Sequence, residues 1–103
     1  ILMPGSDVDY LFNRVLPMLP AGAIVHVHDI MLPDPYPEAW TWRGYNEQNA
    51  LVPWLVGGAF RALFASHFAA TRMTGELARS AVAGLPTALG AIPASLWLMR
   101  TGA

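Results

Sequence analysis

The first twenty residues combine a helix-start signal with an apolar stripe. Ser6 and Asp9 have the spacing of a capping box, with Asp in place of the usual Glu or Gln. Pro17 would clash with the turn before it, so the pattern predicts a helix that begins after Ser6 and ends at Leu16. The apolar positions that form the stripe recur every three or four residues, at Val8, Leu11, Phe12, Val15, Leu16 and Leu19.

Residues 23–30 have a different pattern. The run is short, rich in β-branched residues and apolar on both alternating sides. Such a run is typical of a strand that lies inside a sheet with helices covering both faces. A helix followed by a turn and a buried strand predicts part of an α/β unit.

The rest of the chain alternates between irregular and regular patterns. Residues 32–42 hold three prolines and three aromatic residues and are predicted to form an irregular loop. Residues 45–52 are predicted to be helical, and Pro53 should kink or end that helix. Three further segments complete the prediction. They are residues 60–66, which fit a helix slightly better than a short core strand, a helix at 76–82, and a last strand at 94–100.

Composition limits the classes of partner. The chain has 103 residues, enough for one domain, of which 54% are hydrophobic and 13% charged. Ordinary domains carry roughly 25% charged residues, so we expect some apolar surface to meet another chain. The six basic residues, all arginine, balance seven acidic ones, which argues against a nucleic-acid partner. The absence of cysteine excludes disulfides and a cysteine nucleophile, and a cytoplasmic location is the default expectation.

Two features, the start of the chain and its longest uncharged stretch, indicate whether it belongs to a longer polypeptide and whether it spans a membrane. The sequence begins Ile-Leu-Met-Pro-Gly, without an initiator methionine or a signal pattern, and we expect a piece of a longer polypeptide. Residues 80–99 carry no charged side chain and have nearly the length of a membrane span. Two glycines and two prolines interrupt this stretch, so no membrane span is predicted.

The first candidate for chemistry is the group of His26, His28 and Asp29. Alternation along a strand places the two histidines on one side and Asp29 on the other. Ligand crevices in open α/β sheets lie beyond the carboxyl ends of strands, which places His28 and Asp29 at the mouth of a crevice. His26 is expected to be a neutral, hydrogen-bonded core residue. A His-x-His metal-dependent hydrolase is a third hypothesis, but it needs further ligands and the only other histidine is His67.

A second candidate is a group of aromatic side chains with polar side chains beside them, between Tyr36 and Glu47. These side chains can line a substrate pocket, or they can form a lid that only covers a sheet edge, and both interpretations stay open. No nucleophile elbow, Walker lysine or dinucleotide-binding glycine motif is present. The group comprises Tyr36, Trp40, Trp42, Tyr45, Asn46 and Glu47.

The order of these motifs resembles the C-terminal half of class I S-adenosylmethionine-dependent methyltransferases, above all bacterial members with a "pGGiivvHDi" strand. The resemblance rests on residues 16–30, 33–40, 45–48 and 94–98 and spans nearly the whole chain. It implies that residues 1–103 are a partial domain, the C-terminal portion of a Rossmann-like α/β sheet. The family's strand order is 3-2-1-4-5-7-6, with the last strand antiparallel. The resemblance thus makes residues 23–29, 60–66 and 94–100 its fifth, sixth and seventh strands, and it favours strand for 60–66.

The resemblance also implies a function. The family binds S-adenosylmethionine through a glycine-rich loop and an acidic residue in its N-terminal half, and neither is present here. Asp29 matches an aspartate that ligates magnesium in metal-dependent members, but Ile30 stands where those members have asparagine. The chain would then be the acceptor-side part of an enzyme that methylates a small-molecule hydroxyl.

The implied roles can be assigned to residues. His28 and Asp29 would be catalytic, and the pocket would be lined by Trp40, Tyr45 and Asn46. The implied partners are the small-molecule acceptor and the missing N-terminal half or another copy of the chain, and the isolated chain would be inactive. The alternative is a non-catalytic interaction module that docks a partner through an apolar sheet edge.

Overall fold

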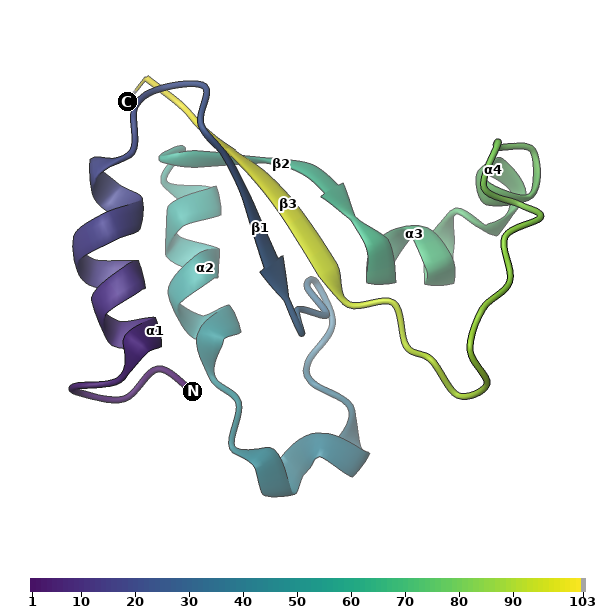
Figure 1. The fold of residues 1–103 in the computed structure, drawn as a ribbon, viewed down its shortest axis with the longest axis horizontal. Helices are drawn as coiled ribbons and strands as arrows, with labels where there is room; N and C mark the ends of the chain where they lie inside the picture. Colours follow the sequence, from purple (N-terminus) through teal and green to yellow (C-terminus); the bar gives the residue numbers. More distant parts are fainter. Residues whose placement is uncertain (103) are drawn as a thin grey trace.

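The computed structural model describes residues 1–102 and has mixed α/β character, with a small antiparallel sheet (Figure 1). Helical segments precede and separate the strands along the chain. In order they are α1 (Asp7–Tyr10), the π-helical η1 (Leu11–Val15), the 3-10 helix η2 (Leu16–Met18), β1 (Ile24–His28), the 3-10 helix η3 (Glu38–Arg43), α2 (Glu47–Val56), β2 (Phe60–Ala65), α3 (Ser66–Arg72), α4 (Thr74–Ala78) and β3 (Ser95–Arg100).

The sheet has the order β1-β3-β2, so the last strand in the chain lies in the middle. β3 is antiparallel to both neighbours, and β1 and β2 therefore run parallel to each other without pairing. A bulge between Ala62 and Phe64 shifts the register of β2. The predicted strands at 23–30 and 94–100 are confirmed, and residues 60–66 form a strand rather than the helix that periodicity slightly favoured.

The first helical segment begins as predicted but ends later. The Ser6 hydroxyl oxygen accepts a hydrogen bond from the Asp9 backbone N–H at 3.1 Å, which caps α1. Helical turns continue through η1 and η2 to Met18, past the predicted end at Leu16. Pro17 is tolerated because it lies in the first turn of η2, where its missing N–H has no partner to lose. Pro53 likewise lies inside α2, which continues to Val56.

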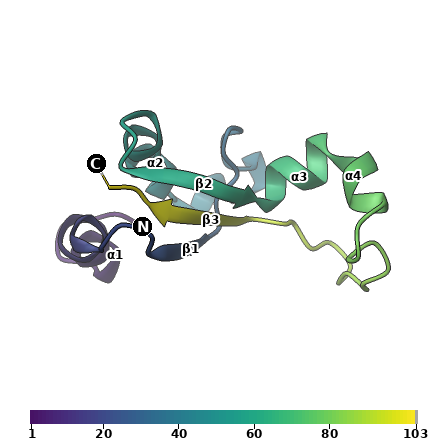
Figure 2. The ribbon, with the colours of Figure 1, turned by 90° about the horizontal axis from the view of Figure 1, so that it is seen from above.

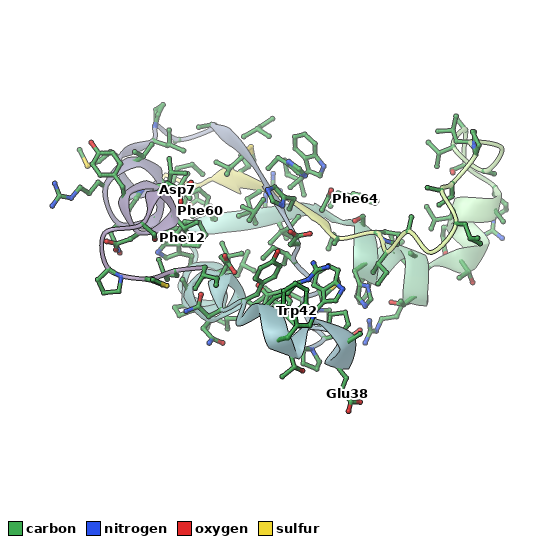
Figure 3. The ribbon with its side chains drawn as sticks, turned by 60° about the horizontal axis from the view of Figure 1, so that its bottom comes forward. Asp7, Phe12, Glu38, Trp42, Phe60 and Phe64 are labelled. Carbon is green, nitrogen blue, oxygen red and sulfur yellow. The ribbon has the colours of Figure 1, made fainter. Side chains whose placement is uncertain are left out.

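The core lies between one face of the sheet and the layer formed by α1, η1, η2 and α2. These helices lie together on the same side of the strands (Figures 1 and 2). Phe12 of η1 and Phe60 of β2 meet in this layer (Figure 3). The buried cluster consists of Phe12, Leu16, Ile30, Leu51, Phe60, Leu96 and Leu98.

The prediction that β1 is an inner strand with both faces covered is wrong for residues 1–102. β1 pairs only with β3 and is an edge strand of this sheet. Ile24 is 62% exposed, because no helix of residues 1–102 covers its face. His26 is exposed too and stacks on Trp97 with ring centres 4.6 Å apart, so its prediction as a buried, hydrogen-bonded core residue is wrong. The composition of β1 is typical of a strand that is covered on both faces, but the helices of residues 1–102 cover only one face.

The segment between α3 and β3 extends away from the sheet (Figures 1 and 2). α4 is shorter than the helix predicted for 76–82, and turns with exposed side chains follow it to residue 93. Within residues 1–102, no helix has the length and apolar character that crossing a membrane requires.

Candidate functional site

A cavity of about 470 Å³ lies beside the carboxyl end of β1. We call it the β1 cavity. Side chains of β1 form one wall, α1 and η1 form another, and the start of α2 closes it. Its polar lining residues are Asp7, His26, His28, Asp29, Tyr45 and Glu47.

The backbone at Asp29 brings the two central candidates together. Asp29 has a φ of 62°, in the left-handed region that residues other than glycine rarely adopt. β1 therefore ends at His28, and the next side chain does not continue the alternation of the strand. The carboxylate oxygen Oδ2 of Asp29 lies 3.1 Å from Nδ1 of His28. The prediction that these two side chains point to opposite sides is thus wrong, because it extended strand geometry one residue too far.

The His28–Asp29 pair has a defined chemical capacity. When Nδ1 donates to the Asp29 carboxylate, Nε2 of His28 is left as a proton acceptor. The His28 side chain is 81% exposed and that of Asp29 35%, so solutes can reach the pair. A carboxylate that orients an imidazole is the arrangement found in general bases.

Glu47 also lines this cavity, at the start of α2. Its Oε1 lies 2.6 Å from the Ile1 ammonium, and Tyr36 donates a hydrogen bond to its Oε2 at 3.4 Å. Burial alone would raise the pKa of Glu47, but the hydrogen bond from the Ile1 ammonium and further donors outweigh it and hold the pKa below the usual value. Burial is also the main reason why the pKa of the Tyr36 hydroxyl is raised, so this hydroxyl stays protonated and can donate.

The three predicted pocket residues have different positions. Tyr45 lines the β1 cavity. Trp40 contacts Tyr45 edge to face, with ring centres 5.9 Å apart. Asn46 is engaged by the N-terminal segment, because its Oδ1 accepts from the Leu2 backbone N–H at 2.7 Å and its Nδ2 donates to the Leu2 carbonyl at 3.0 Å. His28, Asp29 and Tyr45 thus share the cavity, whereas Asn46 fastens residues beside it.

Gln48 was not a candidate from the sequence, yet it holds the loop that follows β1. Its side chain is buried and accepts a hydrogen bond from the Met31 backbone N–H. It also donates from Nε2 to the carbonyl of Asp34 at 3.1 Å. A glutamine in the first turn of a helix gives no sign of this role, since the contact joins residues distant in sequence. Gln48 fixes the path of the loop that leaves the site.

A second polar cluster joins that loop to α3. Asp34 accepts from Arg72 at 2.6 Å and 3.0 Å and lies 3.1 Å from Nε2 of His67. The hydrogen bond from Arg72 is the largest influence on the pKa of Asp34 and holds it below the usual value. This arrangement clamps the loop against α3, and it places His67 in an ion-pair cluster with an arginine.

The metal hypotheses find little support in this geometry. Across residues 1–102, no three His, Cys, Asp or Glu side chains gather closely enough to hold a metal ion. Asp29 is engaged by His28, and the side chain of Ile30 offers no oxygen ligand. The residues present therefore do not fit a magnesium site at Asp29, and a His-x-His hydrolase lacks its remaining ligands.

No family model, curated protein or solved structure matches this chain. The described site combines an oriented imidazole, a cavity beside it and an aromatic wall. Such a site can bind a small molecule and remove a proton from it.

Proposed function

We propose that this chain is the C-terminal, acceptor-side part of an S-adenosylmethionine-dependent methyltransferase that acts on a small-molecule hydroxyl. The observation that carries the proposal is the sheet order β1-β3-β2, with the last strand antiparallel in the middle. Periodicity and composition do not predict this order. It agrees with the order that the family resemblance implies for the fifth, seventh and sixth strands.

The uncovered parts of the sheet support the same proposal. β1 has a free edge, and within residues 1–102 the face that carries Ile24 and Trp97 has no helix over it. A free edge offers unpaired backbone N–H and C=O groups to another strand. In the proposal, the N-terminal half pairs with β1 and covers this face, and it carries the glycine-rich loop that binds the methyl donor.

The residues of this chain would deprotonate and orient the acceptor. S-adenosylmethionine, when bound by the complete enzyme, supplies an electrophilic methyl group. Nε2 of His28 takes the proton from the acceptor hydroxyl, while Asp29 holds the imidazole in place through Nδ1. Tyr45 forms a wall against which the acceptor is oriented. Much of the rate enhancement then comes from positioning, which can lower the barrier by about 7–11 kcal/mol in favourable cases.

The direct test compares this polypeptide with the product of the complete reading frame that contains it. We expect the complete protein to bind S-adenosylmethionine in calorimetry and to transfer a labelled methyl group, and residues 1–103 alone to do neither. Donor binding by residues 1–103 alone, or no binding by the complete protein, would contradict the proposal.

Variants of the complete protein test the roles of the His28–Asp29 pair. His28→Gln should lower kcat by about 10²- to 10⁴-fold, because the proton acceptor is lost. Asp29→Asn should lower kcat less. Glu38→Gln is the control, since Glu38 is exposed on η3 and contacts neither residue of the pair. Equal activity of His28→Gln and the control would remove His28 as the base.

The second candidate function is a non-catalytic module that docks a partner through the sheet. The exposed apolar side chains on the open face, Ile24, Phe64 and Trp97, favour it. Gel filtration of residues 1–103 separates the two candidates. A module made to stand alone should elute as a defined monomer or dimer, whereas half of a domain should self-associate over a range of sizes.

A further inference from the structure

Arg43 lies among three aromatic rings of the segment that leads into α2. Its guanidinium carbon is 4.2 Å from the ring centre of Trp40, 5.5 Å from that of Trp42 and 5.6 Å from that of Tyr45. We call these four residues the Arg43 cluster. The contacts fall within the range of cation–π interactions, which hold a guanidinium in a defined orientation.

The charge of Arg43 is not neutralised within the cluster. Arg43 is half-buried, and in residues 1–102 it makes no ion pair or hydrogen bond with a carboxylate. Arg72 shows the contrast, since Asp34 accepts two hydrogen bonds from its guanidinium. A half-buried guanidinium that is oriented by aromatic rings and lacks an anion keeps its planar donor fork available for one.

The cluster is joined to the candidate site through Tyr45. The ring of Tyr45 contacts Arg43 and also lines the β1 cavity that contains His28 and Asp29. Three carboxylates line that cavity, and each accepts a hydrogen bond or lies against an imidazole: Asp7 accepts from the Val8 N–H, Asp29 lies 3.1 Å from Nδ1 of His28, and Glu47 accepts from Tyr36. Glu38, on the same 3-10 helix as Arg43, points outward, away from Trp42 (Figure 3). None of these carboxylates forms an ion pair with Arg43, so an anion beside Arg43 would not have to displace one.

We infer that Arg43 binds an anionic group, a carboxylate or a phosphate, of the molecule that occupies the β1 cavity. Trp42 is 81% exposed and gives the body of that molecule a surface on which to stack. The inference rests on the proposed function for the identity of this molecule as the methyl acceptor. It then narrows the acceptor class to small molecules that carry both a hydroxyl and an anionic group.

The test measures equilibrium binding to the product of the complete reading frame that contains residues 1–103, without any methyl donor. 4-Hydroxybenzoate is compared with 4-hydroxybenzamide, which has nearly the same shape and no charge, and inorganic phosphate and 4-hydroxyphenyl phosphate form the phosphate arm. Binding is followed by tryptophan fluorescence, because two indoles adjoin Arg43. We expect at least one of the two anionic phenols to bind roughly 10- to 100-fold more tightly than the amide, the range for a charge-assisted hydrogen-bonded pair.

Three variants test whether Arg43 is the residue responsible for the preference for the anion. Arg43→Gln should remove the preference for the anion, and Arg43→Lys should retain part of it. Arg61→Gln, the same change on the exposed part of β2, should leave the preference unchanged. Circular dichroism establishes whether each variant is folded, and Arg43→Lys carries the test if Arg43→Gln does not fold.

Equal binding of anion and amide, no binding of any probe, or an unaltered preference in Arg43→Gln would overturn the inference. These outcomes are independent of the proposed methyl transfer, which fails only in assays with the methyl donor. A preference for the phosphate probe over the benzoate would identify the anion as a phosphate, and the reverse preference would identify it as a carboxylate.

Discussion

The two faces of the sheet both carry large apolar side chains but have opposite environments. On β3, Leu96 and Leu98 are 2% and 0% exposed against the helical layer, while Trp97 between them is 42% exposed. On β1, Val25 and Val27 pack against the core, whereas Ile24 and His26 are exposed. The covered face is thus apolar, and the open face combines apolar and polar side chains.

In this respect the sheet differs from an antiparallel sheet whose open face is suited to water. Antiparallel sheets with one solvated face normally alternate apolar and polar residues along each strand. Here the open face mixes exposed apolar side chains, Ile24 and Trp97, with the polar side chains of His26 and His28. Ile24 and Trp97 are the positions that favour a second cover over the open face, and no helix of residues 1–102 supplies it.

The largest difference in the free energy of unfolding should be between substitutions at Leu98 and Trp97, which are adjacent on β3. Leu98→Ala should lower the free energy of unfolding by about 2–5 kcal/mol, because it leaves a cavity in the core. Trp97→Ala on the open face should cost less than about 1 kcal/mol. Urea unfolding followed by circular dichroism measures both. Similar losses at the two positions would mean that the open face is covered in solution.

The next effect concerns the link between the helical layer and the loop after β1. Gln48→Leu should lower the free energy of unfolding by about 1–3 kcal/mol, since it leaves the Met31 N–H and the Asp34 carbonyl without their partner. The matched control is Asn49→Leu, the same kind of change at the exposed next position of α2. A similar loss in the control would assign the effect to α2 rather than to the loop.

A pH-dependent effect should follow from the clamp between the loop and α3. The hydrogen bond from Arg72 lowers the folded-state pKa of Asp34 below 3.8, so the clamp stabilises the fold above this pH and the stabilisation is lost as pH falls through the lowered pKa. The urea midpoint should therefore fall on acidification below about pH 4, and it should fall less in Asp34→Asn. Parallel pH profiles of the two proteins would contradict this account.

The smallest effect on stability should occur at the free edge. Ile24→Thr keeps a β-branched side chain and should change the free energy of unfolding by no more than about 0.5 kcal/mol. Self-association at high concentration should nevertheless decrease, because the change removes apolar surface from the open face. Sedimentation velocity measures this decrease. Unchanged association would locate the self-associating surface elsewhere.

The parts of the fold that local pattern determines were predictable from the sequence. Ser6 as a cap and the strands at 23–30 and 94–100 follow from spacing and residue type. Residues 60–66 were ambiguous, because a short apolar run fits both a helix and a strand. Periodicity slightly favoured the helix, and only the family resemblance favoured the strand that forms.

The candidate site was predictable only in part. His28, Asp29 and Tyr45 were identified, and they do share one cavity. The left-handed backbone of Asp29 and the position of Arg43 among Trp40, Trp42 and Tyr45 were not identified. Both depend on backbone conformations in an irregular segment, which the spacing of apolar and polar residues does not determine.

The central place of β3 has a consequence for synthesis. β1 and β2 make no pairing with each other, and each bonds only to β3, the last of the three strands to leave the ribosome. The edges of β1 and β2 that face β3 therefore stay unpaired in a nascent chain until Arg100 has emerged. Premature termination before residue 95 would remove the strand that holds the sheet together.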